Sequence, residues 1–259
     1  MNLRSSRCTI PVAALALAAT SCAAPLTDAQ SPSAPTFASW QKARRRLAEI
    51  RAEASGSGPR TMRLALTLRE PRTGRTLEAR GAVAVAPPEA LRMILLGPGG
   101  TTALDLWVRG DSFRFAVPAI DLLRRGDATT PREAMRGLPV DFLRWWMLRP
   151  ASGKLLWHEA ERGGDRFVLR EGQATIELFA APGKGRVEAR RTTWTSRAGE
   201  ASRRIDEETI EADRMGCGSV RYRQASTGLA ITVDCEGVET SRAPNERAFA
   251  DPDAPPEGS

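Results

Sequence analysis

The chain has 259 residues and a formal net charge of +7, and its basic residues are almost all arginine, because lysine occurs only at positions 42, 154 and 184. The arginines are spread along the chain, often beside Glu or Asp, whereas a nucleic-acid-binding face needs clustered basic residues with interleaved aromatics. We therefore expect no nucleic-acid partner. A basic surface is compatible with anionic lipid headgroups.

The first 21 residues are typical of a secretory signal peptide. Arg4 and Arg7 precede an apolar run, Ile10–Ala19, that is too short to span a bilayer. Small residues then lead to Cys22, and this pattern resembles the lipobox of bacterial lipoproteins. The resemblance implies that Cys22 carries acyl chains that anchor the protein to a membrane. The alternative is an ordinary signal peptide that is cleaved nearby, with Cys22 incidental. Ala23, rather than Asp, follows the cysteine, and by analogy with enteric lipoproteins this favours the outer membrane, with the protein facing the periplasm.

Composition divides the rest of the chain into three parts. Residues 22–36 are rich in Ala, Pro, Ser and Thr and are predicted to form a flexible tether. Residues 243–259 are rich in Pro and acidic residues and are predicted to be a disordered tail. Residues 37–242 are long enough for one domain with a sizeable core.

The domain begins with a predicted helix and continues with strands. Ser39 is a suitable cap for an amphipathic helix that starts near Trp40, with an apolar stripe of Trp40, Ala43, Leu47, Ile50 and Ala54. Alternating segments predict strands at residues 62–68, 75–85, 91–96, 101–108 and 112–117. The turns between them are short, which favours antiparallel neighbours.

The strand pattern stops over residues 118–137, which read as short helical pieces and polar loops. Asp141 then caps a predicted short helix that carries the adjacent residues Trp145 and Trp146. Either both indoles belong to the core, or one meets a partner or a ligand. Strands are predicted again at 155–159, 166–170, 175–179, 185–194, 203–215, 219–222 and 229–235. The expected fold is mainly β (α+β), an open antiparallel half-barrel of about eleven strands with covering helices.

The residues that carry chemistry point away from catalysis. Cys217 and Cys235 both flank strand-like segments, and we expect a disulfide between them that links the last hairpin. Two thiols and the single histidine, His158, give no metal-ligand set. The sequence contains no GxSxG, HExxH or phosphate-cradling motif. We therefore expect a non-enzymatic protein without a cofactor.

Apolar side chains at alternating positions are expected to line the interior of the sheet. A curved sheet with a helical cover encloses either a packed core or a ligand cavity, and the sequence leaves both open. The predicted cavity residues are Leu64, Leu66, Val83, Val85, Ile94, Leu96, Leu104, Leu106, Phe113, Phe115, Trp145 and Trp146.

Several short motifs, in the same order and at similar spacing from about Phe37 to Trp157, resemble the LolB family. They are Trp40-Gln41, Pro88-Glu89-Ala90-Leu91-Arg92, Leu95–Thr101, Leu104-Asp105-Leu106, and Leu138-Pro139-Val140 followed by Leu143-Arg144-Trp145. The resemblance implies a LolA/LolB-like fold and an apolar cavity that takes acyl chains from a LolA-like periplasmic carrier and passes a lipoprotein to the outer membrane.

The resemblance also implies a membrane-facing loop at Pro98, Gly99 and Gly100. LolB proteins carry an exposed leucine in this loop, and the matching position here is Gly99. This difference implies a divergent relative that binds lipid or lipoprotein without the full transfer activity. The alternative is a lipid-anchored interaction or scaffold module of the envelope, with a solid core and a partner patch around Trp145 and Trp146.

Overall fold

The computed structural model describes residues 36–56, 58–69, 73–135, 137–183, 185–195, 201–214 and 216–254. Residues from Phe37 onward form a compact unit of their own. The predicted signal peptide, Cys22 and the predicted tether up to residue 35 lie outside the described residues.

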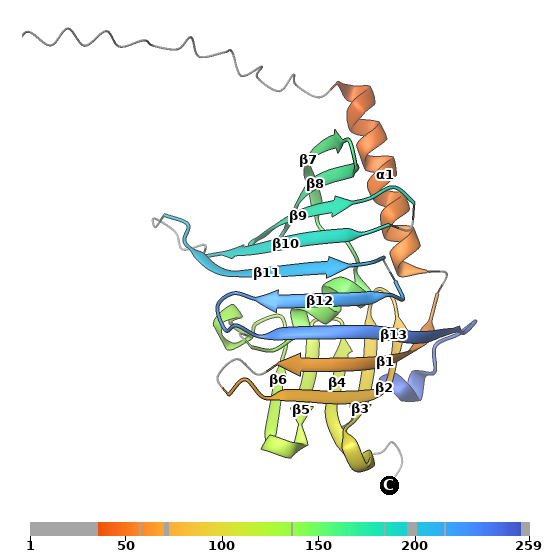
Figure 1. The fold of residues 1–259 in the computed structure, drawn as a ribbon, viewed down its shortest axis with the longest axis vertical. Helices are drawn as coiled ribbons and strands as arrows, with labels where there is room; N and C mark the ends of the chain where they lie inside the picture. Colours follow the sequence, from red (N-terminus) through yellow and green to blue (C-terminus); the bar gives the residue numbers. More distant parts are fainter. Residues whose placement is uncertain are drawn as a thin grey trace, which may run out of the picture. The chain divides into compact units, whose positions relative to one another are not determined.

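A single antiparallel sheet contains the thirteen strands of the described residues (Figure 1). The first six are β1 (Arg60–Arg69), β2 (Thr76–Ala86), β3 (Ala90–Leu96), β4 (Thr102–Arg109), β5 (Ser112–Val117) and β6 (Leu122–Gly126). The other seven are β7 (Lys154–Glu161), β8 (Gly164–Glu171), β9 (Ala174–Ala180), β10 (Val187–Trp194), β11 (Arg204–Ala212), β12 (Ser219–Gln224) and β13 (Ala230–Thr240).

The strand order is β6-β5-β4-β3-β2-β1-β13-β12-β11-β10-β9-β8-β7. The sheet therefore consists of two meanders, one from each half of the chain, joined where β1 pairs with β13. Since β6 and β7 lie at opposite ends of this order, the sheet is open rather than closed. The predicted fold class, mainly β with an open antiparallel sheet, is confirmed.

The helical elements are short apart from the first. They are α1 (Phe37–Ser55), η1 (Pro98–Gly100), η2 (Pro118–Ile120), η3 (Arg132–Met135), α2 (Val140–Leu143), η4 (Arg144–Leu148) and η5 (Glu246–Phe249). The helix α1 begins at Phe37, slightly earlier than predicted, and buries Ala43, Leu47, Ile50 and Ala54 as its predicted stripe requires. Its apolar stripe packs into the same core cluster as the sheet.

One strand was not predicted. Residues 122–126 of β6 fall in the stretch expected to form short helical pieces and polar loops, but they pair with β5 at one edge of the sheet. The strand is short, and Leu123, Arg124 and Arg125 are all exposed, so it lacks the apolar alternation that identifies a half-buried strand.

The predicted inward face of β3 was wrong. Ile94 and Leu96 are 40% and 43% exposed, whereas Leu91, Met93 and Leu95 are fully buried. Residues 93–96 are all apolar, so within them alternation cannot decide between two registers that differ by one residue. Arg92, on the same face as Ile94 and Leu96, was the one signal that this face points outward. The neighbouring strands decide it, because Met93 lies opposite Val83 and Leu106.

The expectation of a disordered tail is also corrected for residues 243–254. Phe249 of η5 is only 3% exposed, and its carbonyl oxygen accepts a 2.8 Å hydrogen bond from Trp107 Nε1 on β4. The segment is polar in composition, but its one large apolar side chain finds a place against the outer face of the sheet.

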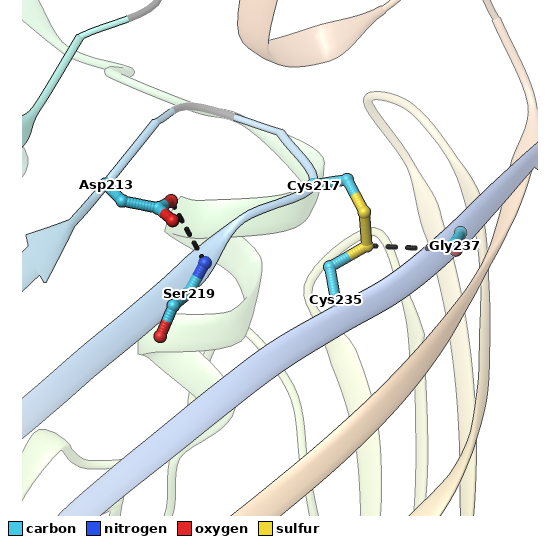
Figure 2. The surroundings of a disulfide bond; sticks show 5 residues. All are labelled: Asp213, Cys217, Ser219, Cys235 and Gly237. Atoms are coloured by element: carbon cyan, nitrogen blue, oxygen red, sulfur yellow. Dashed lines mark hydrogen bonds between the residues drawn. A yellow bond between two sulfur atoms is a disulfide. The ribbon is translucent and has the colours of Figure 1, made fainter.

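The predicted disulfide is confirmed. Cys217, just before β12, is bonded to Cys235 on β13, with Cα atoms 5.1 Å apart (Figure 2). Beside it, Asp213 Oδ1 accepts a 3.0 Å hydrogen bond from the backbone N–H of Ser219. The bond therefore joins the turn between β11 and β12 to the last strand.

Candidate functional site: an apolar inner face beneath a helical plug

The inner face of the N-terminal meander is a continuous apolar surface. Register places Met62, Val83, Met93, Leu106 and Phe115 in one row across five strands. Ten of the twelve predicted cavity residues are buried and belong to the same core cluster, the exceptions being Ile94 and Leu96. The ten are Leu64, Leu66, Val83, Val85, Leu104, Leu106, Phe113, Phe115, Trp145 and Trp146.

A short helical segment formed by α2 and η4, here called the plug, packs into this core. Its buried side chains are Val140, Phe142, Leu143, Trp145, Trp146, Met147 and Leu148. The Phe142 ring stacks on the ring of Tyr222 from β12, with centroids 4.3 Å apart. The two indoles of the plug are both buried in the core, so the partner patch that the scaffold alternative places around Trp145 and Trp146 is not present on the surface.

Arg60 on β1 connects the plug to α1. Its side chain donates hydrogen bonds to the carbonyl oxygens of Ser55 and Ala54 in the last turn of α1, and to Met147 O of the plug at 3.3 Å. Arg60 is only 7% exposed, and burial lowers the pKa of its guanidinium. The three carbonyl groups are neutral partners, so this contact positions both helical elements without forming an ion pair.

Two further contacts attach the plug to the rest of the sheet. Arg144 donates to the carbonyl oxygens of Asp111, between β4 and β5, and Ser112, the first residue of β5, at 2.6 and 3.3 Å. Just before the plug, the backbone N–H of Gly137 donates to Gln224 Oε1 of β12 at 2.9 Å. The plug is therefore attached to both meanders by hydrogen bonds between side chains and backbone.

A buried charged cluster lies where the plug meets the C-terminal meander. Arg191 Nη1 on β10 is 2.6 Å from Glu208 Oε2 on β11, and the Tyr222 hydroxyl donates to Glu208 Oε1 at 2.7 Å. Asp141 of the plug lies 4.0 Å from the same guanidinium. Burial, together with the Glu208 carboxylate, raises the pKa of Tyr222 far above its ordinary value. A cavity of about 30 Å³ beside the cluster is large enough for a water molecule.

Three large hollows of the described structure lie away from most of the predicted cavity residues. These surface hollows, of about 510, 560 and 550 Å³, border mainly polar residues, and among the twelve predicted residues only Phe113 borders one of them. The plug's own side chains thus occupy the inner face in this structure. One buried polar atom of the plug, Trp145 Nε1, has no hydrogen-bond acceptor among the described residues.

His158, the single histidine, contacts a carboxylate that is also bound by α1. His158 Nε2 lies 3.0 Å from Asp165 Oδ1, and Asp165 Oδ2 accepts a hydrogen bond from Arg46 of α1. Among the described residues, no cluster of His, Cys, Asp and Glu has the number of ligands that a metal ion needs. Within the same residues, no helix is both long and apolar enough to cross a membrane.

Sequence reasoning missed Arg60 and Arg144, although one signal for Arg60 was available. Arg60 precedes Met62, Leu64 and Leu66 at intervals of two, so strand alternation places this basic residue on the apolar inner face. The partners of both arginines are backbone carbonyl groups, which a sequence pattern does not reveal.

The structure thus defines a class of protein, one with an open antiparallel sheet whose apolar inner face is covered by a helix and a helical plug. No family model matches the sequence, and no curated protein matches it. The similar solved structures include a LolA superfamily protein from Nitrosomonas europaea, with 12% identity, 82% of this chain and 97% of that chain covered, and a TM-score of 0.49.

Two further structures show a similar degree of likeness. A domain from Vibrio parahaemolyticus whose name refers to outer membrane lipoprotein sorting has 11% identity, 79% and 95% of the two chains covered, and a TM-score of 0.44. A DUF1329 family protein from Desulfovibrio piger has 13% identity, 80% and 96% coverage, and the same TM-score of 0.44.

Proposed function

We propose that this protein binds the acyl chains of lipids or lipoproteins between the inner face of the sheet and the plug. The observation that carries the proposal is the apolar inner face beneath a short segment that side-chain-to-backbone hydrogen bonds attach to the sheet. In this proposal the structure is the closed, unliganded form, and the acyl chain takes the place of the plug's apolar side chains. Each methylene buried contributes about 0.8 kcal/mol, so a long chain compensates for the burial that the plug loses.

The polar contacts of the plug suit such a displacement. Arg60 and Arg144 bind carbonyl groups, which water replaces at modest cost when the plug moves. The buried Trp145 N–H, which lacks an acceptor among the described residues, suits the carbonyl oxygen at the head of an ester- or amide-linked acyl chain.

The setting we propose is the outer membrane, with acylated Cys22 as the anchor and the protein facing the periplasm. A LolA-like carrier is the expected donor of lipoprotein, on the basis of the sequence motifs that resemble LolB. Tethering at the membrane would keep the binding site close to the bilayer that receives the cargo.

Membrane contact requires an apolar group at the end of the sheet, and Gly99 of η1 supplies none. Because β5 is antiparallel to β4, the turn η2 lies at the same end of the strands as η1. Ile120 of η2 is 70% exposed. We propose that Ile120, beside the loop Pro98–Gly100, provides the apolar contact with the bilayer.

The filled inner face favours a second candidate, a lipid-anchored scaffold module with a solid core. An acyl-binding protein and a scaffold differ in whether the plug moves. Binding of a fluorescent fatty acid, and its displacement by unlabelled palmitate, distinguishes the two candidates. We propose to measure it on two full-length variants, Cys22→Ser and Cys22→Ser/Arg60→Met.

If the protein binds acyl chains, we expect a fluorescence signal that saturates with the fatty acid and is reversed by palmitate. The fluorescence should rise several-fold faster with Arg60→Met, because the contact of Arg60 with Met147 is lost. Arg63→Met is the matched control, since Arg63 lies on the same strand with its side chain exposed. Absence of binding above background in all variants would favour the scaffold.

The anchor is tested separately. Cys22→Ser is expected to move the protein from the membrane fraction to the soluble periplasmic fraction. A variant that stays with the membrane would contradict acylation of Cys22 and leave the acyl-binding proposal untouched.

A further inference from the structure

The outer face of the N-terminal meander carries a row of cationic and aromatic side chains. Register places Arg92, Trp107, Arg114 and Arg125 directly opposite one another on β3, β4, β5 and β6. We call these four residues the arginine row. The Arg125 guanidinium lies 6.0 Å from the centre of the Trp107 ring. Like charges directly opposite each other on neighbouring strands are unfavourable, so Arg114 and Arg125 need an anionic partner.

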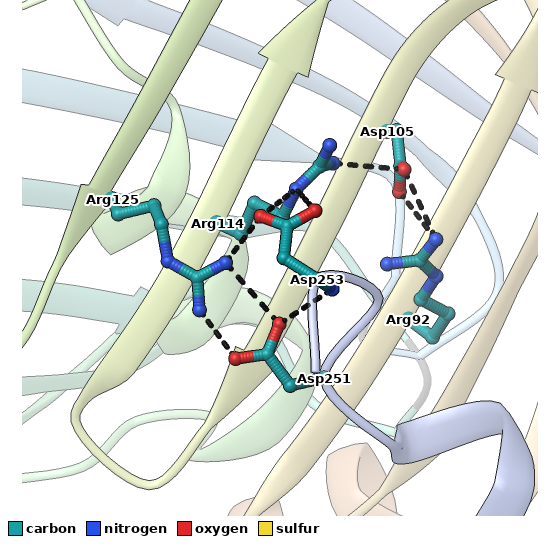
Figure 3. A network of polar contacts seen from close by, with 6 residues as sticks. All are labelled: Arg92, Asp105, Arg114, Arg125, Asp251 and Asp253. Atoms are coloured by element: carbon teal, nitrogen blue, oxygen red, sulfur yellow. Dashed lines mark hydrogen bonds and ion pairs between the residues drawn. The ribbon is translucent and has the colours of Figure 1, made fainter. Parts of the chain in front are cut away.

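The sheet itself supplies only part of the negative charge that these arginines need. Asp105 on β4 pairs with Arg92 at 2.9 Å and with Arg114 at 3.0 Å (Figure 3). Both carboxylates that contact Arg125, Asp251 and Asp253, come from the C-terminal segment Asn245–Ala254, here called the strap. The charges balance only with the strap in place, because one carboxylate of the sheet faces three guanidinium groups.

The strap is bound as a peptide ligand would be. Arg114 Nε donates to both carboxylate oxygens of Asp253, at 3.0 and 2.9 Å, and Trp107 Nε1 donates to the carbonyl oxygen of Phe249. Phe249 is the one deeply buried side chain of the strap's described residues. A Phe-X-Asp-X-Asp sequence thus meets an indole and two guanidinium groups in register.

The strap contacts are of a kind that another segment can replace. The side chains of Arg125, Asp251 and Asp253 remain 41%, 29% and 39% exposed, so water and other carboxylates can compete for these ion pairs. A surface hollow of about 550 Å³ continues from Trp107, Arg125 and Asp251 toward residues 126–131. The strap leaves this part of the surface open.

We infer that the arginine row is a docking surface for an extended acidic segment of a partner protein, and that the strap occupies it in the isolated chain. A partner segment with an aromatic residue followed by acidic residues at alternate positions displaces the strap. Both Arg114 and Arg125 bind carboxylates, and Arg125 binds Asp251 in bidentate geometry through Nη1 and Nη2. This gives the surface its preference for carboxylates over neutral side chains.

The probe for this surface is a fluorescein-labelled peptide with the sequence of residues 245–254, titrated into the full-length protein and followed by fluorescence anisotropy. The protein variant Asp251→Asn/Asp253→Asn weakens the strap through exposed side chains alone and therefore keeps the fold. A second variant adds Phe249→Ala, with circular dichroism as the check on folding.

We expect the peptide to bind the Asp251→Asn/Asp253→Asn variant at least tenfold more tightly than the wild type. Adding Arg125→Gln to that variant should reduce the affinity at least tenfold, and Arg124→Gln, a neighbouring exposed arginine on the same strand, is the matched control. A peptide with both aspartates changed to asparagine should bind at least tenfold more weakly.

Equal affinity for the wild type and both strap variants, or for the acidic and the neutral peptide, would overturn the inference. The inference would also be overturned, in favour of strap exchange between two copies, if the wild type were a dimer and the Asp251→Asn/Asp253→Asn variant a monomer. Stronger binding of the variant to phosphatidylglycerol vesicles than to the peptide would do so in favour of a membrane surface.

Discussion

Tyr222 is the only tyrosine of the chain, so its ionisation can be followed without interference from another phenol. Its ring stacks on Phe142 of the plug, and its hydroxyl donates to the buried Glu208 carboxylate. A tyrosinate at this position would be buried and would face a negative charge, which is why the pKa of Tyr222 lies far above 10.0 in the folded protein.

The raised pKa gives a prediction for alkaline pH. The unfolded chain loses the phenol proton near pH 10.0, whereas the folded chain keeps it, so stability from this group is complete below pH 10.0 and falls as pH rises above that value. We expect tyrosinate absorbance to appear only together with the loss of the β-sheet circular dichroism signal. A separate absorbance step near the ordinary pKa, with the sheet intact, would contradict the buried position of Tyr222.

Arg191 is the cation that pairs with the buried Glu208 carboxylate in the cluster that the plug completes, and Asp141 lies near both Arg191 and Arg144. Arg191→Met removes the partner of Glu208 and the nearby positive charge for Asp141, and uncompensated buried charge costs about 3–5 kcal/mol. Urea unfolding should show a loss of that order. Arg190→Met, at the next position of β10 with an exposed side chain, is the control and should change the free energy of unfolding by about 0.5 kcal/mol or less.

At the scale of the element, β3 shows how a strand with large apolar residues on both faces obtains its register from its neighbours. Leu95 is fully buried and Ile94 is 40% exposed, although both are large aliphatic residues at adjacent positions. Leu95→Ala should lower the free energy of unfolding by about 2–5 kcal/mol. Ile94→Ala should lower it by about 1 kcal/mol or less. Denaturant unfolding of the two variants checks the register, and equal losses would contradict it.

The strands as a set show which parts of the fold the sequence could and could not predict. Alternation identified twelve of the thirteen strands of the described residues, because a half-buried strand repeats every two residues. It failed at β6, which lies at an edge and exposes consecutive residues. The contacts of the strap and the contact of Arg60 with Met147 could not be predicted either, because these partners are distant in sequence and are reached only once the sheet has formed.

The last hairpin is predicted to depend on its disulfide. Cys217 and Cys235 are separated by 18 residues, and closing a loop of about this length stabilises a protein by about 3 kcal/mol through the unfolded state. Cys217→Ala/Cys235→Ala should therefore lower the free energy of unfolding by roughly that amount in urea. An unchanged midpoint with an unchanged slope would show that the hairpin does not need the bond.

At the scale of the molecule, the strap links the chain terminus to the N-terminal meander, and acid should release it. Hydrogen bonding to Arg125 lowers the pKa of Asp251 below its ordinary value of 3.8, so the stabilising charge is complete above that value and is lost as pH falls below it. Pepsin digestion between about pH 4 and pH 2 should show cleavage near Phe249 only at the lower end. Asp251→Asn/Asp253→Asn should be cleaved across the whole range, and equally rapid cleavage of the wild type at the upper end would contradict the prediction.

The pairing of β1 with β13 has a consequence for how the chain folds. The strands β1 to β6 are synthesised first, but β1 keeps an unpaired edge until the last strand arrives. Contacts of such large sequence separation slow folding, and an exposed edge in the meantime invites aggregation. Synthesis therefore has to reach β13 before the sheet can become continuous, and a chaperone that holds the early strands apart would raise the yield of native protein.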